Sequence, residues 1–97
     1  MQKFQYLKKD KINQLPKTAG VYIFKKGAKL LYIGKAVNLR SRVKNHQGES
    51  VLGLAKSIGY MKTKSEANAL ILENKLIKKY QPKYNTQWKD DKNYFYV

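Results

Sequence analysis

A single carboxylate stands inside an apolar stretch in the C-terminal third of the sequence. Residues 66–80 have helical periodicity, and at about 100° per residue Glu73 falls within the apolar arc of that helix. The arc consists of Ala69, Leu70, Leu72, Leu76, Ile77 and Tyr80. Burying a carboxylate is costly unless a cation or hydrogen-bond donors meet it. Glu73 is therefore either half of a structural ion pair with a lysine or a ligand for a hard cation such as Mg²⁺ or Mn²⁺.

Two tyrosines, Tyr22 and Tyr32, lie on the two strands of a predicted β-hairpin. Apolar runs rich in β-branched and aromatic residues flank a Lys-Gly-Ala-Lys break, which is the pattern of such a hairpin. With the turn centred on Gly27, antiparallel pairing places Tyr22 opposite Tyr32. The same face is expected to carry Phe24 and Leu30, and the other face Val21, Ile23, Leu31 and Ile33. Because Gly20 and Gly34 have no side chains, a bulky ligand could approach both phenols.

Two further polar residues share one face of a predicted helix at 39–46. Leu39 and Val43 are four residues apart on this helix and are expected to be buried. Arg42 and His46 are also four residues apart, on the stripe beside the apolar one. We therefore expect Arg42 and His46 at the rim of the core, where one ligand can contact both.

The elements that position these residues predict an α/β domain. The hairpin strands are expected at about 21–26 and 30–34, a third strand at 58–62, and helices at 39–46, 51–57 and 66–80. The expected helix N-caps are Asn38, Ser50 and Ser65. Pro82 stops the last helix. The predicted fold is a small three-stranded antiparallel sheet flanked by helices, in the order β-β-α-α-β-α.

Both ends of the chain are expected at the margin of this domain. Residues 1–19 form a basic lead-in with a short amphipathic helix that Pro16 ends. Its apolar face is expected to consist of Phe4, Tyr6, Leu7, Ile12 and Leu15. Residues 86–97 form a tail that mixes aromatic and charged side chains, and residues 93–97 have a strand-like composition. We expect the tail to lead into a C-terminal region outside this sequence.

The charge of the sequence points to a polyanionic partner. Lys and Arg number 21 against 6 Asp and Glu, which gives a net charge of +15. Such a charge on one small domain is typical of nucleic-acid binding. A solvated lysine-rich surface and an anionic membrane surface are the alternatives. No segment combines a basic face with the broad apolar face that membrane binding requires.

The composition also limits the class of protein and its compartment. A chain of 97 residues that is 42% hydrophobic suffices for a single domain, 1–97. No apolar run approaches the ~20 residues of a membrane span, and the first ten residues lack the pattern of a signal peptide. The absence of cysteine excludes disulfides and thiolate metal sites. We therefore expect a cytoplasmic protein.

Seven residues, five of them introduced above, occur in a familiar order. Gly20-Val21-Tyr22 and Tyr32-Ile33-Gly34 resemble the two tripeptides of the GIY-YIG nuclease family, with Val in place of the middle Ile. In that family a basic residue, an Arg, a His or Tyr, a metal-binding Glu and an Asn follow. This sequence has them as Lys35, Arg42, His46, Glu73 and Asn85.

Within this family the sequence is most similar to the UvrC branch. The segments that carry this similarity are 73–85, Gly34-Lys35-Ala36 and 89–92, and the resemblance covers roughly residues 12–97. His46 departs from the pattern, because UvrC proteins mostly have Tyr at this place and other branches have His. The role of His46 in proton transfer is accordingly left open.

The resemblance implies a metal-dependent endonuclease domain that hydrolyses a DNA phosphodiester. Its implied site residues are Tyr22, Tyr32, Lys35, Arg42, His46, Glu73 and Asn85, with Glu73 as the ligand of Mg²⁺ or Mn²⁺ and no small-molecule cofactor. In a UvrC protein the reaction would be the 3′-side incision of nucleotide excision repair, within the SOS response and with UvrB as partner. The isolated domain is expected to be a monomer.

The residue types suit this chemistry. Arg42 can hold non-bridging phosphoryl oxygens bidentately, and a cation on Glu73 can stabilise the leaving 3′ oxygen. One phenol would take the proton from water, and we favour Tyr22 because it opens its strand beside Gly20. Since a free tyrosine has a pKa of about 10, Lys35 and the metal ion are expected to favour the phenolate. Tyr32 would then position the water or share the proton.

Two other functions fit parts of the pattern. One is a free-standing GIY-YIG endonuclease, and the other is a non-catalytic nucleic-acid-binding module on the same fold. Glu73 argues against the second, because pure binding has no use for an acidic residue beside an anionic ligand. A metal-dependent nicking assay distinguishes an enzyme from a binding module.

Overall fold

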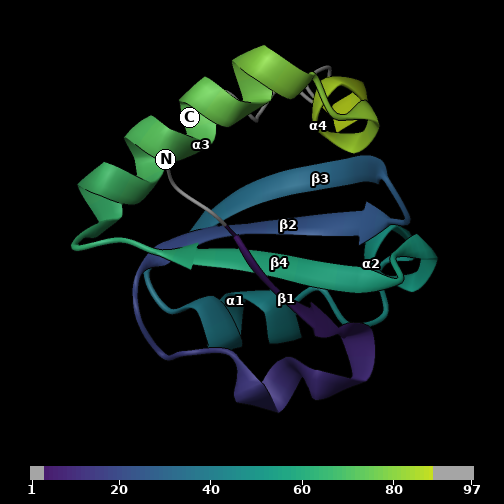
Figure 1. Cartoon of the computed structure of the whole chain (residues 1–97), viewed down its shortest axis with the longest axis horizontal. Helices are drawn as coiled ribbons and strands as arrows, with labels where there is room; N and C mark the ends of the chain where they lie inside the picture. The colour runs from purple at the N-terminus through teal and green to yellow at the C-terminus, as the bar shows by residue number, and fades with distance from the viewer. Residues whose placement is uncertain (1–3, 89–97) are drawn as a thin grey trace.

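The centre of the structure, a computed structural model that describes residues 4–88, is a four-stranded antiparallel sheet (Figure 1). The strands are β1 (Gln5–Lys8), β2 (Gly20–Lys26), β3 (Lys29–Ala36) and β4 (Ser57–Lys62). They lie side by side in the order β1-β4-β2-β3, and every pair is antiparallel. The hairpin strand β3 is therefore an edge strand, whereas β2 is central.

Helices cover both faces of this sheet. The helical segments are η1 (Lys9–Gln14, 3₁₀), α1 (Leu39–Lys44), α2 (Ser50–Leu54), α3 (Glu66–Tyr80) and α4 (Lys83–Trp88). Figure 1 shows α3 along the β3 side of the sheet with α4 beyond its end, and α1 and η1 on the opposite face. Two apolar clusters fill these layers, a large one around Tyr22, Phe24 and Leu39 and a small one around Val21, Ile23 and Ile33. No helix within residues 4–88 is long and apolar enough to cross a membrane.

The lead-in is a strand and not the expected amphipathic helix. Residues 5–8 pair with residues 57–60 of β4 and add the fourth strand to the sheet. Tyr6 is half exposed whereas its neighbour Leu7 packs on the large cluster, so the side chains alternate with a period of two. The prediction was wrong because it placed both on one helical face. Ile12 and Leu15 are buried as expected.

The hairpin register differs from the expected one by two residues. Phe24, and not Tyr22, lies opposite Tyr32, and Tyr22 lies opposite Gly34. One residue comes from the turn, which lies between Gly27 at φ 63° and Ala28, so that Lys26 pairs with Lys29. The other comes from a register shift between Phe24 and Lys25. Leu30 and Leu31 also lie on the faces opposite to those expected. Leu31 packs in the large cluster with Tyr22, and Leu30 packs on the small one.

The helix boundaries agree with the sequence except around α2 and at the end of α1. Asn38 caps α1 and Ser65 caps α3 through side-chain hydrogen bonds to Ser41 N and Asn68 N, as expected. The N-cap of α2 is Glu49 rather than Ser50, and its side chain makes no capping bond. This helix ends at Leu54 instead of continuing to 57, and α1 ends at Lys44, before the expected 46. The tail forms α4 as far as Trp88, and residues 89–97 lie outside the described part.

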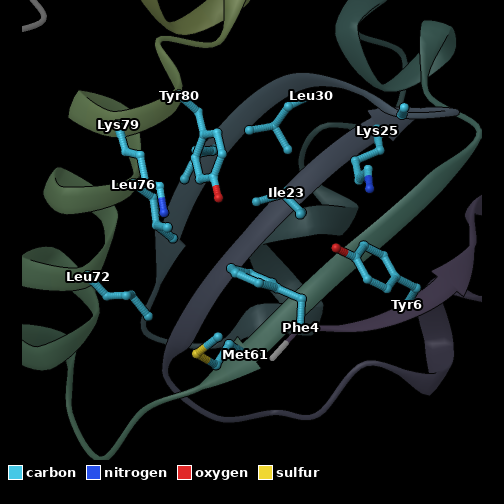
Figure 2. A pocket seen from close by; sticks show the side chains of 12 residues that line it. Phe4, Tyr6, Ile23, Lys25, Leu30, Met61, Leu72, Leu76, Lys79 and Tyr80 are labelled. Carbon is cyan, nitrogen blue, oxygen red and sulfur yellow. The ribbon is translucent and has the colours of Figure 1, made fainter. Parts of the chain in front are cut away.

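The apolar arc of α3 is covered only in part. Ala69 is buried, whereas Leu70 is 43% and Tyr80 52% exposed. Between α3 and the sheet runs a groove of about 420 Å³, and Figure 2 shows Leu72, Leu76 and Tyr80 on its helix side. Phe4, Tyr6 and Met61 line its other side. None of the seven predicted site residues lines this groove, so the chemistry is not expected there.

Candidate active site

Tyr22 is completely buried on the α1 face of the sheet. A Cβ atom at Gly34 would overlap with Cζ and Oη of Tyr22, so this glycine gives room to the phenol that lies across from it. A Cβ atom at Gly20 would overlap with the Met61 carbonyl oxygen and with Leu39. The two glycines therefore permit close packing, and the expected open approach to Tyr22 is wrong.

Three aromatic rings gather around this phenol. The ring centroid of Tyr22 lies 5.4 Å from that of Phe24, 6.1 Å from that of Tyr32 and 5.5 Å from that of His46. Tyr32 and His46 are also 5.5 Å apart. Tyr32 is half-buried, in contrast to Tyr22. The two phenols thus share one cluster, as the sequence predicted, but Tyr32 is the one that reaches the surface.

His46 lies inside this cluster rather than at the rim of the core. It is 3% exposed, and its Nε2 is 2.7 Å from Oη of Tyr22. Its Nδ1 is 2.7 Å from Oε1 of Glu49. Burial lowers the pKa of His46 below its ordinary value of 6.5, and Glu49 opposes this effect without overcoming it. The imidazole is therefore neutral near pH 7. Glu49 was not among the predicted residues; its place three residues after the only histidine was the available signal.

Arg42 lies beside the phenols with its side chain exposed. Its interactions with Tyr22 raise the pKa of Arg42, so the guanidinium stays charged. Burial raises the pKa of the Tyr22 phenol well above its ordinary value of 10; Tyr32 raises it further, whereas Arg42 lowers it. Tyr22 is thus a neutral phenol at physiological pH. The Arg42 guanidinium beside it would stabilise any negative charge that develops on the phenol.

Glu73 reaches the same region from α3. It is half-buried, and burial raises its pKa, while Lys35 and Arg42 act to lower it. The ion pairs of the described residues are Lys35–Glu66, at 3.0 Å, and His46–Glu49, and neither contains Glu73. The alternative of a structural ion pair is therefore weakened. Lys35 is bonded to Glu66 and is not among the groups that shift the pKa of Tyr22, contrary to the expected support of a phenolate.

The donor set suits one hard cation. No group of three or more His, Cys, Asp or Glu side chains gathers within residues 4–88, so these residues form no closed transition-metal site. Mg²⁺ retains several waters and commonly takes only one or two protein carboxylates. Glu73, a half-buried carboxylate outside the ion pairs above, fits that requirement.

Asn85 holds the edge of the sheet. Its Oδ1 accepts a hydrogen bond from the Ile33 backbone N–H, and its Nδ2 donates one to the Ile33 carbonyl, both at 2.8 Å. Ile33 lies between Tyr32 and Gly34 on β3, so this two-point contact fixes the strand that carries the outer phenol. Asn85 thus acts through the backbone of its neighbour, which its position in the sequence did not reveal.

These contacts bring all seven predicted residues to the edge formed by β3. The phenols and His46 lie on the α1 face, Glu73 and Lys35 on the α3 side, and Arg42 interacts with both groups. A four-stranded sheet with such an edge defines a nuclease domain of the GIY-YIG class. The model of the UvrC-like GIY-YIG domain family matches residues 18–86, and the chain belongs to that family.

Solved structures and curated relatives agree with this membership. The GIY-YIG N-terminal endonuclease domain of UvrC from Thermotoga maritima, bound to magnesium as its catalytic cation, is 42% identical with a TM-score of 0.70, over 77% of this chain and 91% of that one. UvrABC system protein C is 43% identical in Solibacter usitatus, over 92% of this chain, and 48% identical in Borrelia duttonii, over 86%. The chain covers only 16% and 15% of those two proteins.

Proposed function

We propose that this domain cuts DNA by hydrolysing a phosphodiester bond with the help of a divalent cation. The observation that carries the proposal is Glu73, a half-buried carboxylate outside the ion pairs of the described residues and within the electrostatic reach of Arg42. A carboxylate beside a phosphate-binding cation is unfavourable for an anionic ligand unless a metal ion lies between them.

Arg42 binds the scissile phosphate in this proposal. Its charged and exposed guanidinium offers donors to two non-bridging oxygens, and it can offset the negative charge that grows on them. Glu73 would hold Mg²⁺, or Mn²⁺ with the same ligand preference, which supplies Lewis-acid stabilisation of the leaving 3′ oxygen when bound. Asn85 keeps β3 in place beneath both groups.

Burial argues for Tyr32 rather than Tyr22 as the base. An open strand end beside Gly20 would favour Tyr22, but the side chain of Tyr22 is completely buried. Tyr32 is half-buried and belongs to the same ring cluster. We therefore assign Tyr32 as the phenol that meets the attacking water and Tyr22 as the inner phenol, which is hydrogen-bonded to His46.

The biological setting follows from the relatives. Their name, UvrABC system protein C, supports a role of this domain in DNA excision repair. The finer proposal is that it makes the incision on the 3′ side of a lesion with UvrB as partner. Because the chain covers about a sixth of those proteins, the choice of substrate is assigned to parts of a longer protein or to its partners.

The test is a nicking assay with supercoiled plasmid DNA and the 97-residue chain. We expect nicked circles with Mg²⁺ or Mn²⁺, none after chelation with EDTA, and recovery when excess Mg²⁺ is added. DNA binding is measured in parallel by fluorescence anisotropy. DNA binding without cleavage under every metal condition would contradict the proposal and favour the non-catalytic binding module.

A further inference from the structure

The only histidine of the sequence is held at both ring nitrogens. Its Nε2 is 2.7 Å from Oη of Tyr22, and its Nδ1 is 2.7 Å from Oε1 of Glu49. A carboxylate can only accept hydrogen bonds, so Nδ1 must carry a proton. In a neutral imidazole Nε2 is then an acceptor, and the Tyr22 hydroxyl is the donor.

The turn that carries Glu49 directs it to this ring. The backbone N–H of Glu49 donates to the carbonyl of His46 at 3.0 Å, and Gly48 between them has a φ of 91°, which favours glycine. Glu49 is also the N-cap of α2, yet its side chain makes no capping bond. The short side chains of Ser, Thr, Asp and Asn usually accept from the helix N–H groups at an N-cap, whereas the longer side chain of Glu49 bonds the imidazole.

We propose that Glu49 is a positioning residue of this nuclease site, whose carboxylate holds His46 in the Nδ1–H tautomer and keeps Nε2 available as the hydrogen-bond acceptor of Tyr22. The Tyr22 O–H is then directed at Nε2, and its oxygen remains an acceptor for Arg42, which also interacts with the outer phenol Tyr32. This assignment deepens the proposed function and rests on it only for its effect on cleavage.

The direct test is ¹⁵N NMR of the imidazole, which gives one pair of ring-nitrogen signals because the sequence has one histidine. At neutral pH we expect a protonated Nδ1 and an unprotonated Nε2. In Glu49→Ala a substantial fraction of the ring should change to the Nε2–H tautomer. Asp10→Asn is the control, because it removes one exposed carboxylate on η1 and should leave the signals unchanged. An Nε2–H ring in the parent protein, or unchanged signals in Glu49→Ala, would overturn the proposal.

A second variant keeps the test decisive if Glu49→Ala does not fold. Glu49→Leu retains most of the side-chain bulk but offers no acceptor to Nδ1, so the ring should again lose its fixed Nδ1–H tautomer. A fully Nδ1-protonated ring in this variant would equally overturn the proposal.

The cleavage assay gives the second readout. We expect Glu49→Ala to lower kcat about tenfold or more with little change in KM, because a carboxylate that orients an imidazole acts on the chemical step. Asp10→Asn should match the parent protein in both constants. Equal kcat values in Glu49→Ala and Asp10→Asn would overturn the claim that Glu49 affects the chemical step. The NMR result does not depend on cleavage, so a failure of the proposed nuclease activity is distinguishable from a failure of this assignment.

Discussion

Tyr22 and Tyr32 look equivalent in the sequence but differ in burial, and we assign them different roles for this reason. Tyr22 is completely buried and hydrogen-bonded to His46, whereas Tyr32 is half-buried. Both spacing and residue type pointed to a pair of phenols on one face, and that part was correct. The hairpin alone could not tell which phenol meets water, because the difference comes from α1 and the histidine that packs over Tyr22.

Removing the two hydroxyls separately should therefore have different effects. We expect Tyr32→Phe to lower single-turnover cleavage by about 10²- to 10⁴-fold, as for a lost general base. Tyr22→Phe leaves Nε2 of buried His46 without its donor, so it should lower the free energy of unfolding by about 1–3 kcal/mol. The measurements are single-turnover nicking and urea denaturation. Wild-type cleavage by Tyr32→Phe would refute the assignment of the base.

Arg42 should matter more for turnover than for affinity. With a net charge of +15, one cation is a small part of the attraction to DNA, whereas a transition-state contact is worth about 3 kcal/mol or more. Arg42→Ala should thus reduce kcat by about 10²-fold or more and change the Kd for DNA only slightly. Lys44→Ala removes an exposed cation from the same helix and is the matched control. A parallel decline of both quantities would make Arg42 an ordinary phosphate contact.

The lowered pKa of His46 predicts an acid-sensitive fold. Burial disfavours the imidazolium in the folded state, so the unfolded chain binds the proton more readily. The free energy of unfolding should therefore decrease as the pH falls below about 6.5, the ordinary pKa of histidine. Denaturation from pH 5 to 8 measures this slope, and His46→Gln should lose it. An equal slope in both proteins would assign the effect to groups other than His46; Glu73 is not one of them, because its raised pKa gives a slope of the opposite sign.

At the scale of the elements, the edge strand β3 holds the site together. Asn85 attaches α4 to its outer side at Ile33, and β2 pairs with its inner side. The site thus depends on contacts between segments far apart in the sequence, which residue periodicity does not report.

Asn85→Ala should loosen β3 locally. The loss of two hydrogen bonds to Ile33 is expected to cost about 1–3 kcal/mol, and the Ile33 amide should exchange faster with solvent. Amide hydrogen exchange by NMR measures this effect, with the Ile23 amide in central β2 as internal reference. Asn74→Ala, a change at an exposed position of α3, should leave both rates unchanged. Unaltered exchange at Ile33 would contradict the positioning role.

The sequence predicted α3 and the caps of α1 and α3 because local chemistry determines them. Ser65 and Asn38 are good N-caps, and Pro82 cannot continue a helix. The prediction of the hairpin register failed because the order of apolar residues gives no signal for the irregularity after Phe24, which places Tyr22 opposite Gly34. Strand β1 was missed because its four residues form a strand only by pairing with β4.

At the scale of the whole molecule, the linear order of the motif residues predicted the family correctly, but it did not predict the detailed geometry of the site. Lys35, Arg42, Glu73 and Asn85 belong to different elements, and only the fold brings them to one edge. Lys35 is an example of what the linear order could not predict. Its bond to Glu66 depends on the start of α3 lying beside β3. The strong positive charge suits DNA but does not by itself locate the site.

The central claim is that Glu73 binds the cation that cleavage requires. Burial raises the pKa of Glu73, which means that the fold tolerates a neutral group there. Glu73→Gln should accordingly fold with at least the stability of the parent protein, whereas a structural ion pair would predict a loss. Mg²⁺ should raise the Tm of the parent protein and not that of the variant.

The most direct measurement is plasmid nicking by Glu73→Gln, with Tm recorded with and without Mg²⁺ on the same samples. We predict a folded variant that binds DNA, shows no Mg²⁺-dependent rise in Tm and makes no nicks. A less stable variant that still cuts DNA in Mg²⁺ would contradict the account, because Glu73 would then be a structural residue and the cation would bind elsewhere.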